Sequence, residues 1–283
     1  MIKSLSQTTY KTLIKSRRNK TYKGDFGVAG LVCGSVSYQG AATYAASAAL
    51  HTGAGIVCAF IPKDIYLPFA SKISGAVIEP LDSVDGKICD STLTSKIIKR
   101  KCTAVLCGSG LGISDSSAKT TFSVLSLDLP VVLDGDALSA ISTDKSVLDR
   151  NGITVLTPHI GEFAKLCDKT PSEVRNHRVS YALEFSEKYN CTVVLKDYVT
   201  VIADKGKNAF VFSNPVSSLS KGGSGDVLAG MVTSFLSQGY SSVDACSIAV
   251  TLHNACGIMC DKRYGSYYTQ PENIIECISE LIK

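Results

Sequence analysis

The stretch Lys221-Gly222-Gly223-Ser224-Gly225-Asp226-Val227-Leu228-Ala229-Gly230 lies near the C-terminal end of the chain. The apolar residues after Asp226 continue with helical spacing, which predicts that the glycines lie at the start of a helix. Free backbone N–H groups at such a start, together with the positive end of the helix dipole, form a site for an anion. We therefore predict an anion hole at Gly223, Ser224 and Gly225.

Asp226 lies in the first turn of this predicted helix, and its position allows two readings. An acid in the first turn can simply stabilise the helix dipole. It can also act as a base that takes a proton from a hydroxyl group beside a bound phosphate. Only the rest of the chain can decide between the two.

Strand-like apolar runs and helical patterns alternate from Val28 to the C-terminus, and the strands end in glycine-containing or polar loops. This order predicts one doubly wound α/β domain with a mostly parallel sheet and helices on both faces. In such sheets, ligands bind beyond the carboxyl ends of the strands. The predicted strands are 28–33, 56–61, 103–107, 130–134, 153–157, 192–196, 199–203 and 209–212, the last three forming a meander. The predicted helices besides the one at Asp226 are 41–50, 115–125, a short helix after Asp136, 161–167, 172–189, 241–261 and 271–282.

The composition is that of a globular protein with a large core. Hydrophobic residues make up 45% of the 283 residues, and charged residues make up 19%. The charged fraction is below the roughly 25% of an average globular protein, which favours a surface partly covered in a homo-oligomer. The net charge of +4 is too small to indicate a nucleic-acid partner.

Basic side chains gather at the N-terminus, so we predict a basic arm at 1–22 and a single domain at 23–283. The arm lacks the long apolar run of a secretory signal, and no stretch approaches a membrane-spanning helix of about 20 apolar residues. We therefore expect a soluble, cytoplasmic protein with no membrane partner. The 11 cysteines include no Cys-x-x-Cys pair, so we expect them to be reduced and buried.

Other polar residues at predicted strand ends could carry chemistry, and each also has a structural reading. His159 either caps the following helix or binds a ligand. Asp134 and Asp136 either hold Mg²⁺ through carboxylate oxygens or cap the next helix. Lys196 either faces a phosphate as a point charge or extends to solvent. The remaining histidines are expected to pack or lie at the surface: His51, His177 and His253.

The common nucleotide-binding motifs are absent from the sequence. It contains no Gly-x4-Gly-Lys-Ser/Thr, and Gly108-Ser109-Gly110 is followed by Gly112 where a dinucleotide fingerprint needs a later glycine. These absences argue against a P-loop NTPase and against a plain Rossmann dehydrogenase.

An ordered set of motifs nevertheless runs through the chain: Lys23-Gly24-Asp25-Phe26-Gly27, Gly34-Ser35, Gly40-Ala41-Ala42, Gly53-Ala54-Gly55, Gly108-Ser109-Gly110-Leu111-Gly112, Asp134-Gly135-Asp136-Ala137-Leu138, Thr157-Pro158-His159-Ile160-Gly161-Glu162-Phe163 and 221–230. This set resembles the ADP- or ATP-dependent NAD(P)H-hydrate dehydratases of the ribokinase-like superfamily, from about Lys23 to the C-terminus. The Gly-x-Gly-Asp element alone is shared with hydroxyethylthiazole kinase and other ribokinase-like kinases.

The resemblance implies a three-layer α/β/α fold and a role in cofactor repair. The family phosphorylates the ring hydroxyl of hydrated NADH or NADPH (NADHX or NADPHX) with ADP or ATP, and loss of phosphate then restores the ring. The resemblance implies Mg²⁺ as a cofactor and a homo-oligomer, specifically a tetramer. It also favours the reading of Asp226 as the catalytic base beside the anion hole.

By the family's pattern, two groups of residues would bind the two substrates. The residues that would line the hydrated dinucleotide are Ala41, Ala42, Gly110, His159 and Asp226. Those that would hold ADP or ATP are Lys196, Asp197, Tyr198, Val199, Thr200 and Gly225.

The chain departs from the family's pattern at two places. Asp197 stands where the family usually has glycine, and Asn214-Pro215 stands near where the family commonly has Gly-Asn. Because a carboxylate beside nucleotide phosphates would repel them, we predict that Asp197 points to solvent or to a basic partner. Two alternative functions are a vitamin-precursor kinase of the same fold, and a nucleotide-binding protein without catalysis.

Overall fold

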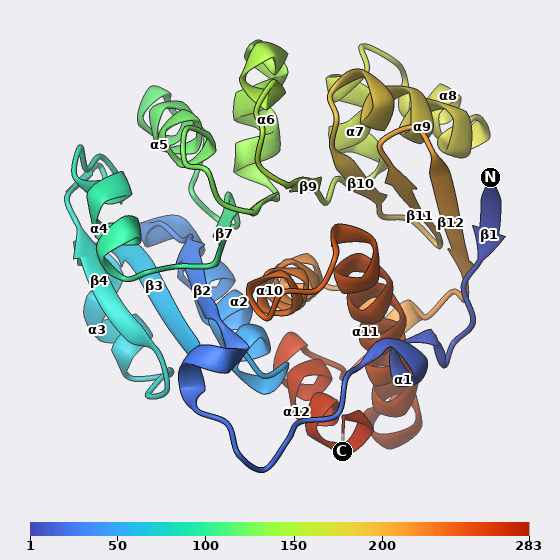
Figure 1. The fold of residues 1–283 in the computed structure, drawn as a ribbon, viewed down its shortest axis with the longest axis horizontal. Helices are drawn as coiled ribbons and strands as arrows, with labels where there is room; N and C mark the ends of the chain where they lie inside the picture. Colours follow the sequence, from blue (N-terminus) through green and yellow to red (C-terminus); the bar gives the residue numbers. More distant parts are fainter. Residues whose placement is uncertain (283) are drawn as a thin grey trace.

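The computed structural model describes residues 1–282, and its centre is a ten-stranded sheet in the order β1-β12-β11-β10-β9-β8-β7-β2-β3-β4 (Figure 1). From β10 to β4 every neighbouring pair of strands is parallel. The strands are β1 (Ile2–Ser4), β2 (Val28–Val32), β3 (Ile56–Pro62), β4 (Val77–Leu81), β7 (Ala104–Cys107), β8 (Val131–Leu133), β9 (Thr154–Leu156), β10 (Thr192–Leu195), β11 (Val199–Asp204) and β12 (Asn208–Ser213). The mostly parallel sheet confirms the predicted fold class.

Helices cover both faces of the sheet and make three layers (Figure 1). The alternation of side chains along β2 shows why: Ala29 and Leu31 belong to one core, whereas Val28 and Val32 belong to the other. One face carries α1 (Thr9–Leu13), α2 (Gln39–His51), α3 (Tyr66–Ala70), α10 (Ser224–Ser237), α11 (Ser242–Tyr264) and α12 (Pro271–Leu281). The other carries α4 (Leu93–Lys99), α5 (Asp115–Leu125), α6 (Asp136–Thr143), α7 (Ile160–Leu166), α8 (Pro171–Asn176) and α9 (Arg178–Lys188).

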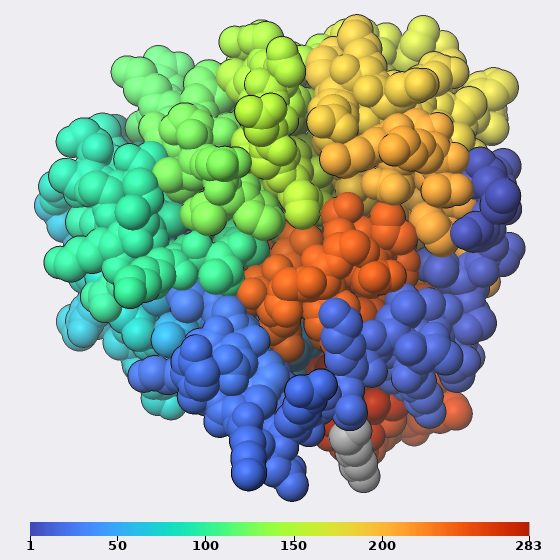
Figure 2. All heavy atoms as spheres, viewed as in Figure 1, coloured from blue at the N-terminus to red at the C-terminus, as the bar shows by residue number. Residues whose placement is uncertain are grey.

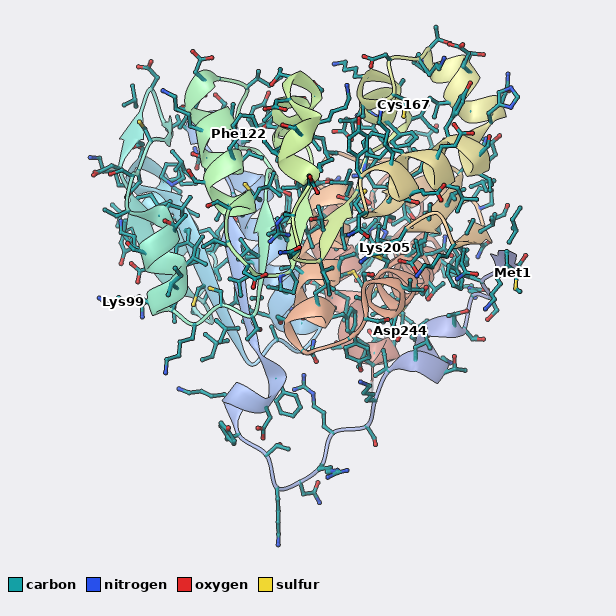
Figure 3. The ribbon with its side chains drawn as sticks, turned by 45° about the horizontal axis from the view of Figure 1, so that its top comes forward. Met1, Lys99, Phe122, Cys167, Lys205 and Asp244 are labelled. Carbon is teal, nitrogen blue, oxygen red and sulfur yellow. The ribbon has the colours of Figure 1, made fainter. Side chains whose placement is uncertain are left out.

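The predicted meander is present at one end of the sheet. β11 is antiparallel to both β10 and β12, and β1 adds a parallel strand outside β12. The segment 1–22, predicted as a basic arm outside the domain, thus supplies a strand to the sheet, and Tyr10 of α1 is buried in the core. Met1, at the sheet edge in Figure 3, donates from its amino group to the Lys207 carbonyl at 2.9 Å. In the space-filling view the blue N-terminal residues lie against the body of the molecule (Figure 2).

Several elements differ from the sequence-based expectation. The single helix expected at 172–189 is broken at His177, whose φ of −121° and ψ of 29° are not helical. β4, α4 and the small hairpin of β5 (Ser83–Val84) and β6 (Lys87–Ile88) were not predicted, because short, polar segments carry little periodicity.

Helix α11 also corrects an expectation. Its 23 residues are long and apolar enough to cross a membrane by length and hydropathy, whereas the sequence-based expectation was that no stretch is. The most apolar part of α11 is, however, 78% buried inside the fold, where it packs between α10, α12 and the sheet. Such burial is typical of a core helix.

The strand order reverses direction between β2 and β7. β2 is followed by β3 on one side, whereas β7 is followed by β8 and β9 on the other. The two loops that leave these strands meet where the Gly34 N–H donates to the Ser109 carbonyl at 2.9 Å. In open α/β sheets such a switch point opens a crevice at the carboxyl ends of the strands, and that is where the candidate site lies.

Candidate active site

The glycine loops and polar residues singled out in the sequence converge at one edge of the sheet. They follow β2, β7, β8, β9 and β10, and parallel strands place all of these carboxyl ends side by side. The start of α10 faces the same edge, since a Cβ added at Gly225 would lie 3.3 Å from Nζ of Lys196. The structure therefore brings the loops and polar residues of the predicted site together at this edge.

The start of α10 has the geometry of an anion site. Gly223 is its N-cap, with a φ of +93° and no side-chain cap, and a Cβ there would collide with the Tyr44 ring. The Ser224 N–H donates to the Lys221 carbonyl at 3.2 Å, so the N–H groups of Gly225 and Asp226 are the ones that the first turn leaves to a ligand among the described residues. Ser224 is buried, and its hydroxyl lies 3.2 Å from Nε2 of His253.

His253 was expected only to pack, but it supports the anion loop. Burial, with the nearby Lys196 charge, lowers the pKa of His253 to about 4. The imidazole is therefore neutral at pH 7 and adds no positive charge beside Ser224. Its position on α11 could be found only from the structure, because nothing in the local sequence separates it from the other histidines.

Asp226 has the properties of a base more than those of a helix cap. Burial and the charge of Asp134 raise its pKa to about 7, although Ser109 and Lys196 act to lower it. A dipole-stabilising acid would have a lowered pKa, because the helix start favours the ionised form. A carboxyl with a pKa near the operating pH is suited to general base catalysis.

Asp134 is held by three donors beneath Asp226. Its Oδ1 accepts from Lys196 Nζ at 2.9 Å and from the Thr157 hydroxyl at 2.6 Å, and its Oδ2 accepts from Ser109 at 3.2 Å. Burial alone would lower the pKa of Lys196, but the charges of Asp134 and Glu162 raise it. Lys196 is therefore a fixed positive charge at the site, and it does not extend to solvent.

The carboxylates do not fit a metal site built by the protein. Both oxygens of Asp134 are occupied by its donors, and Asp136 accepts from the Gly112 N–H at 2.8 Å. Across residues 1–282, no cluster of three or more His, Cys, Asp or Glu side chains could hold a metal ion. The reading of Asp134 and Asp136 as magnesium ligands is therefore not supported by the geometry.

His159 caps α7 and also borders a cavity. Its Nδ1 accepts from the N–H groups of Gly161 at 2.9 Å and Glu162 at 3.2 Å, while Glu162 accepts from the His159 N–H at 2.8 Å. These reciprocal bonds form a capping box that fixes the ring. The exposed imidazole also lines the cavity described next, so its capping role is compatible with the predicted role in ligand binding.

This cavity has a volume of about 790 Å³ and lies between the ends of β10 to β12, the segment 214–221, α10 and α11. Its size is in the range of small-molecule and cofactor sites. Of the residues predicted for ADP or ATP, those that line it are Lys196, Asp197, Tyr198, Thr200 and Gly225, while Val199 lies outside its lining. Lining residues that the sequence reading missed include Phe212, Asn214, Leu219, Lys221, Leu228 and Asn254.

Asp197 lies at the rim of this cavity and has basic partners. Its Oδ2 lies 3.1 Å from Nε of Arg175 and 3.7 Å from a guanidinium nitrogen of Arg178. The Arg178 guanidinium also stacks on the Tyr198 ring at 4.9 Å. The predicted basic partner of Asp197 is thus present, and its charge is already neutralised without a ligand.

Three of the residues expected to line the dinucleotide lie where the start of α2 meets the loops after β2 and β7. A Cβ at Gly110, whose φ is +68°, would lie 2.7 Å from Cβ of Ala41. Ala42 is buried, and a Cβ at Gly34 would lie 3.0 Å from its Cβ. The structure thus brings Ala41, Ala42 and Gly110 together at the switch point, apart from His159 at the cavity side.

Comparisons with known proteins point to one family. The sequence model of the NAD(P)H-hydrate dehydratase family matches residues 29–280. An ADP-dependent (S)-NAD(P)H-hydrate dehydratase from Nitrosopumilus maritimus is 30% identical over 99% of this chain and 97% of its own. The enzyme of the same name from Neisseria meningitidis is 34% identical over 86% and 80%. A solved ADP/ATP-dependent NAD(P)H-hydrate dehydratase from Bacillus subtilis, co-crystallised with ATP and Mg²⁺, superposes with a TM-score of 0.85 at 25% identity, over 98% and 96% of the two chains.

Proposed function

The chain belongs to the NAD(P)H-hydrate dehydratase family, and we propose that it is a nucleotide-dependent dehydratase that converts NADHX or NADPHX back to the reduced cofactor. The observation that carries the proposal is the position of Asp226. Its carboxyl lies in the first turn of α10, next to Gly225, which lines the cavity, and Ser109, the neighbour of Gly110, acts on its pKa. One base is thus placed to act on a hydroxyl from one side and a phosphate from the other.

We assign the cavity between β10, α10 and α11 to ADP or ATP. Apolar side chains such as Phe212, Leu219 and Leu228 offer surface to a base, and Lys196 and Lys221 add positive charge for phosphates. The N–H groups of Gly223, Ser224 and Gly225 would hold the phosphoryl group during transfer, and the Ser224 N–H would exchange the Lys221 carbonyl for a phosphate oxygen. The relatives named above are ADP-dependent or ADP/ATP-dependent enzymes, which supports an adenine nucleotide here.

We assign the crevice with Ala41, Ala42 and Gly110 to the hydrated dinucleotide. Asp226 takes the proton of the ring hydroxyl as its oxygen forms a bond to the terminal phosphorus, and ADP or AMP leaves with the electrons of the broken P–O bond. The ring C–O bond then breaks, phosphate leaves, and loss of a proton from the neighbouring carbon forms the ring double bond. The net reaction removes one water from the ring and converts ATP to ADP, or ADP to AMP, with phosphate.

Magnesium would reach this site with the nucleotide. Mg²⁺ keeps several waters and is commonly bound through substrate phosphates, which suits a site where Asp134 is already paired with Lys196. When bound there, it would neutralise phosphate charge. A homo-oligomer, a tetramer by family resemblance, and a cytoplasmic location remain predictions.

The direct test is to incubate the protein with NADHX or NADPHX and either ADP or ATP, and to follow the return of the dihydronicotinamide absorbance. The account expects return only when a nucleotide is present. Phosphorylation of a vitamin precursor with no return of absorbance would favour the kinase alternative. Nucleotide binding without any turnover would favour the non-catalytic alternative.

A further inference from the structure

The crevice around Asp226 carries more negative than positive charge. Asp134 and Asp136 both act to raise the pKa of Asp226, and the ammonium of Lys196 already pairs with Asp134. The dinucleotide proposed for this crevice is itself anionic, with a diphosphate and, in NADPHX, a 2′-phosphate. Like charges repel strongly in a half-buried site, so this substrate needs a further cation nearby.

Lys87 of β6 lies on this side of the site. Its Nζ donates to the Ile113 carbonyl at 3.1 Å, and its side chain crosses Gly112, where a Cβ would lie 2.9 Å from Cε of Lys87. Gly112 ends the same loop that carries Gly110 and donates to Asp136. The Lys87 charge acts on Asp136, whose pKa burial raises and Lys87 lowers.

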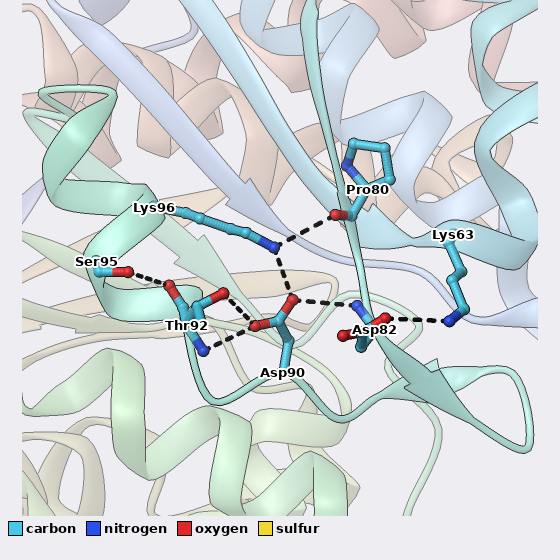
Figure 4. A network of polar contacts seen from close by, with 7 residues as sticks. All are labelled: Lys63, Pro80, Asp82, Asp90, Thr92, Ser95 and Lys96. Carbon is cyan, nitrogen blue, oxygen red and sulfur yellow. Dashed lines mark hydrogen bonds and ion pairs between the residues drawn. The ribbon is translucent and has the colours of Figure 1, made fainter.

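The small hairpin that carries Lys87 is fixed on both sides. At its base, the Asp82 N–H donates to Asp90 at 3.1 Å, and Lys96 pairs with the same carboxylate at 2.7 Å (Figure 4). At its tip, the Gly86 carbonyl accepts from the Val36 N–H at 3.0 Å. Lys87 is therefore held between the loop after β2 and the loop after β7, the two loops that form the switch point.

We propose that Lys87 binds a phosphate group of the hydrated dinucleotide. An ammonium has three donors, and the Ile113 carbonyl takes one. No carboxylate of residues 1–282 forms an ion pair with Lys87, so its charge is available to a ligand. The inference rests on the proposed function, which supplies the phosphates, and adds a specific residue on the dinucleotide side.

The test measures binding of the reduced products, so that it does not depend on turnover. NADH and NADPH are titrated by their fluorescence into the parent protein, Lys87→Met and Lys87→Arg, and ADP is titrated by calorimetry. We expect Lys87→Met to weaken at least one dinucleotide about tenfold, as loss of a partly exposed charge-assisted hydrogen bond would. Lys87→Arg should retain most of the affinity, and ADP affinity should stay within twofold, which also reports an intact fold.

Lys99→Met is the matched control, because Lys99 is exposed at the end of α4, away from the switch point (Figure 3). Equal losses for NADH and NADPH would place Lys87 at the diphosphate, and a larger loss for NADPH would place it at the 2′-phosphate; both support the inference. Unchanged affinities in Lys87→Met, with normal binding by the parent, would overturn it while leaving the proposed function intact. A parent protein that neither binds the reduced dinucleotides nor dehydrates NADPHX would contradict the proposed function.

Discussion

The ammonium of Lys196 lies 2.9 Å from Oδ1 of Asp134, so a buried ion pair joins the ends of β10 and β8 beneath Asp226. The two charges of this pair shift the pKa of Asp226 in opposite directions. Burial raises the pKa of Asp226 most, the charge of Asp134 raises it further, and the charge of Lys196 lowers it. The protonation of Asp226 is thus set by residues that come from three separate parts of the sequence.

Lys196→Met should therefore raise the pKa of Asp226 above its value of about 7, because Asp134 loses its counter-charge while its own charge remains. The acid limb of the kcat/KM profile should move to higher pH, and unfolding should become easier by about 3 kcal/mol, as for other broken buried pairs. Profiles of the parent and of the exposed control Lys207→Met measure the effect. An acid limb at the parent position would show that Lys196 does not influence the base.

The ionised carboxylate of Asp226 should also lower the free energy of unfolding near neutral pH. Its pKa is higher in the folded protein than the value of about 3.9 in an unfolded chain, so folding favours the protonated form. Its contribution is most favourable below about pH 4 and is lost as the pH rises through about 7. Asp226→Asn should thus raise Tm more at pH 8 than at pH 4.5, as measured by calorimetry. An equal Tm difference at both pH values would contradict the raised pKa.

Gly225→Val should weaken nucleotide binding, because the larger side chain would occupy the space for a phosphate. A Cβ at this position lies 3.3 Å from Nζ of Lys196, and the added methyl groups would occupy the space that a phosphate must enter. We expect ADP binding to weaken by about tenfold or more by calorimetry, with α10 intact, because Val has better helix propensity than Gly. Gly222→Ala is the control, since a Cβ there meets no atom within 4 Å. Unchanged affinity in Gly225→Val would place the phosphates elsewhere.

Asp197→Gly should leave nucleotide use almost unchanged. The Asp197 carboxylate is neutralised by Arg175 and Arg178, so its removal relieves little repulsion of a phosphate. We expect the nucleotide KM to change by less than about threefold, which is under about 0.7 kcal/mol. Nucleotide binding that tightens tenfold or more would show that the carboxylate faces the phosphates despite its arginine partners.

Much of the fold could be predicted because parallel, doubly buried strands leave a strong signal. The runs that became β2, β3 and β7 are continuous and apolar, and each precedes a glycine or polar loop. A parallel sheet then brings all of those loops to one edge, so the strand pattern alone was enough to predict where the candidate site lies. The hairpin of β5 and β6 left no such signal because each strand has two residues.

The electrostatics of the site could not be predicted from local sequence. His253 and Ser224 are far apart in the chain, as are Lys196 and Asp134, and only packing brings each pair together. From the sequence, Asp134 and Asp136 could equally be metal ligands or helix caps. The structure instead places donors from Lys196, Thr157 and Ser109 on the oxygens of Asp134. The arginines that neutralise Asp197 lie on α8 and α9. The sequence predicted one unbroken helix over this segment and gave no reason to place these arginines beside Asp197.

The central claim is that Asp226 removes the hydroxyl proton during phosphoryl transfer, and phosphorus NMR with NADPHX and ATP tests it most directly. The parent protein should release one phosphate and one ADP for each NADPH restored. Asp226→Asn should bind ATP with unchanged affinity while turnover falls on the order of a hundredfold or more, as for loss of a general base. Asp226→Asn turnover within a few-fold of the parent, or NADPH restored without consumption of nucleotide, would contradict the account.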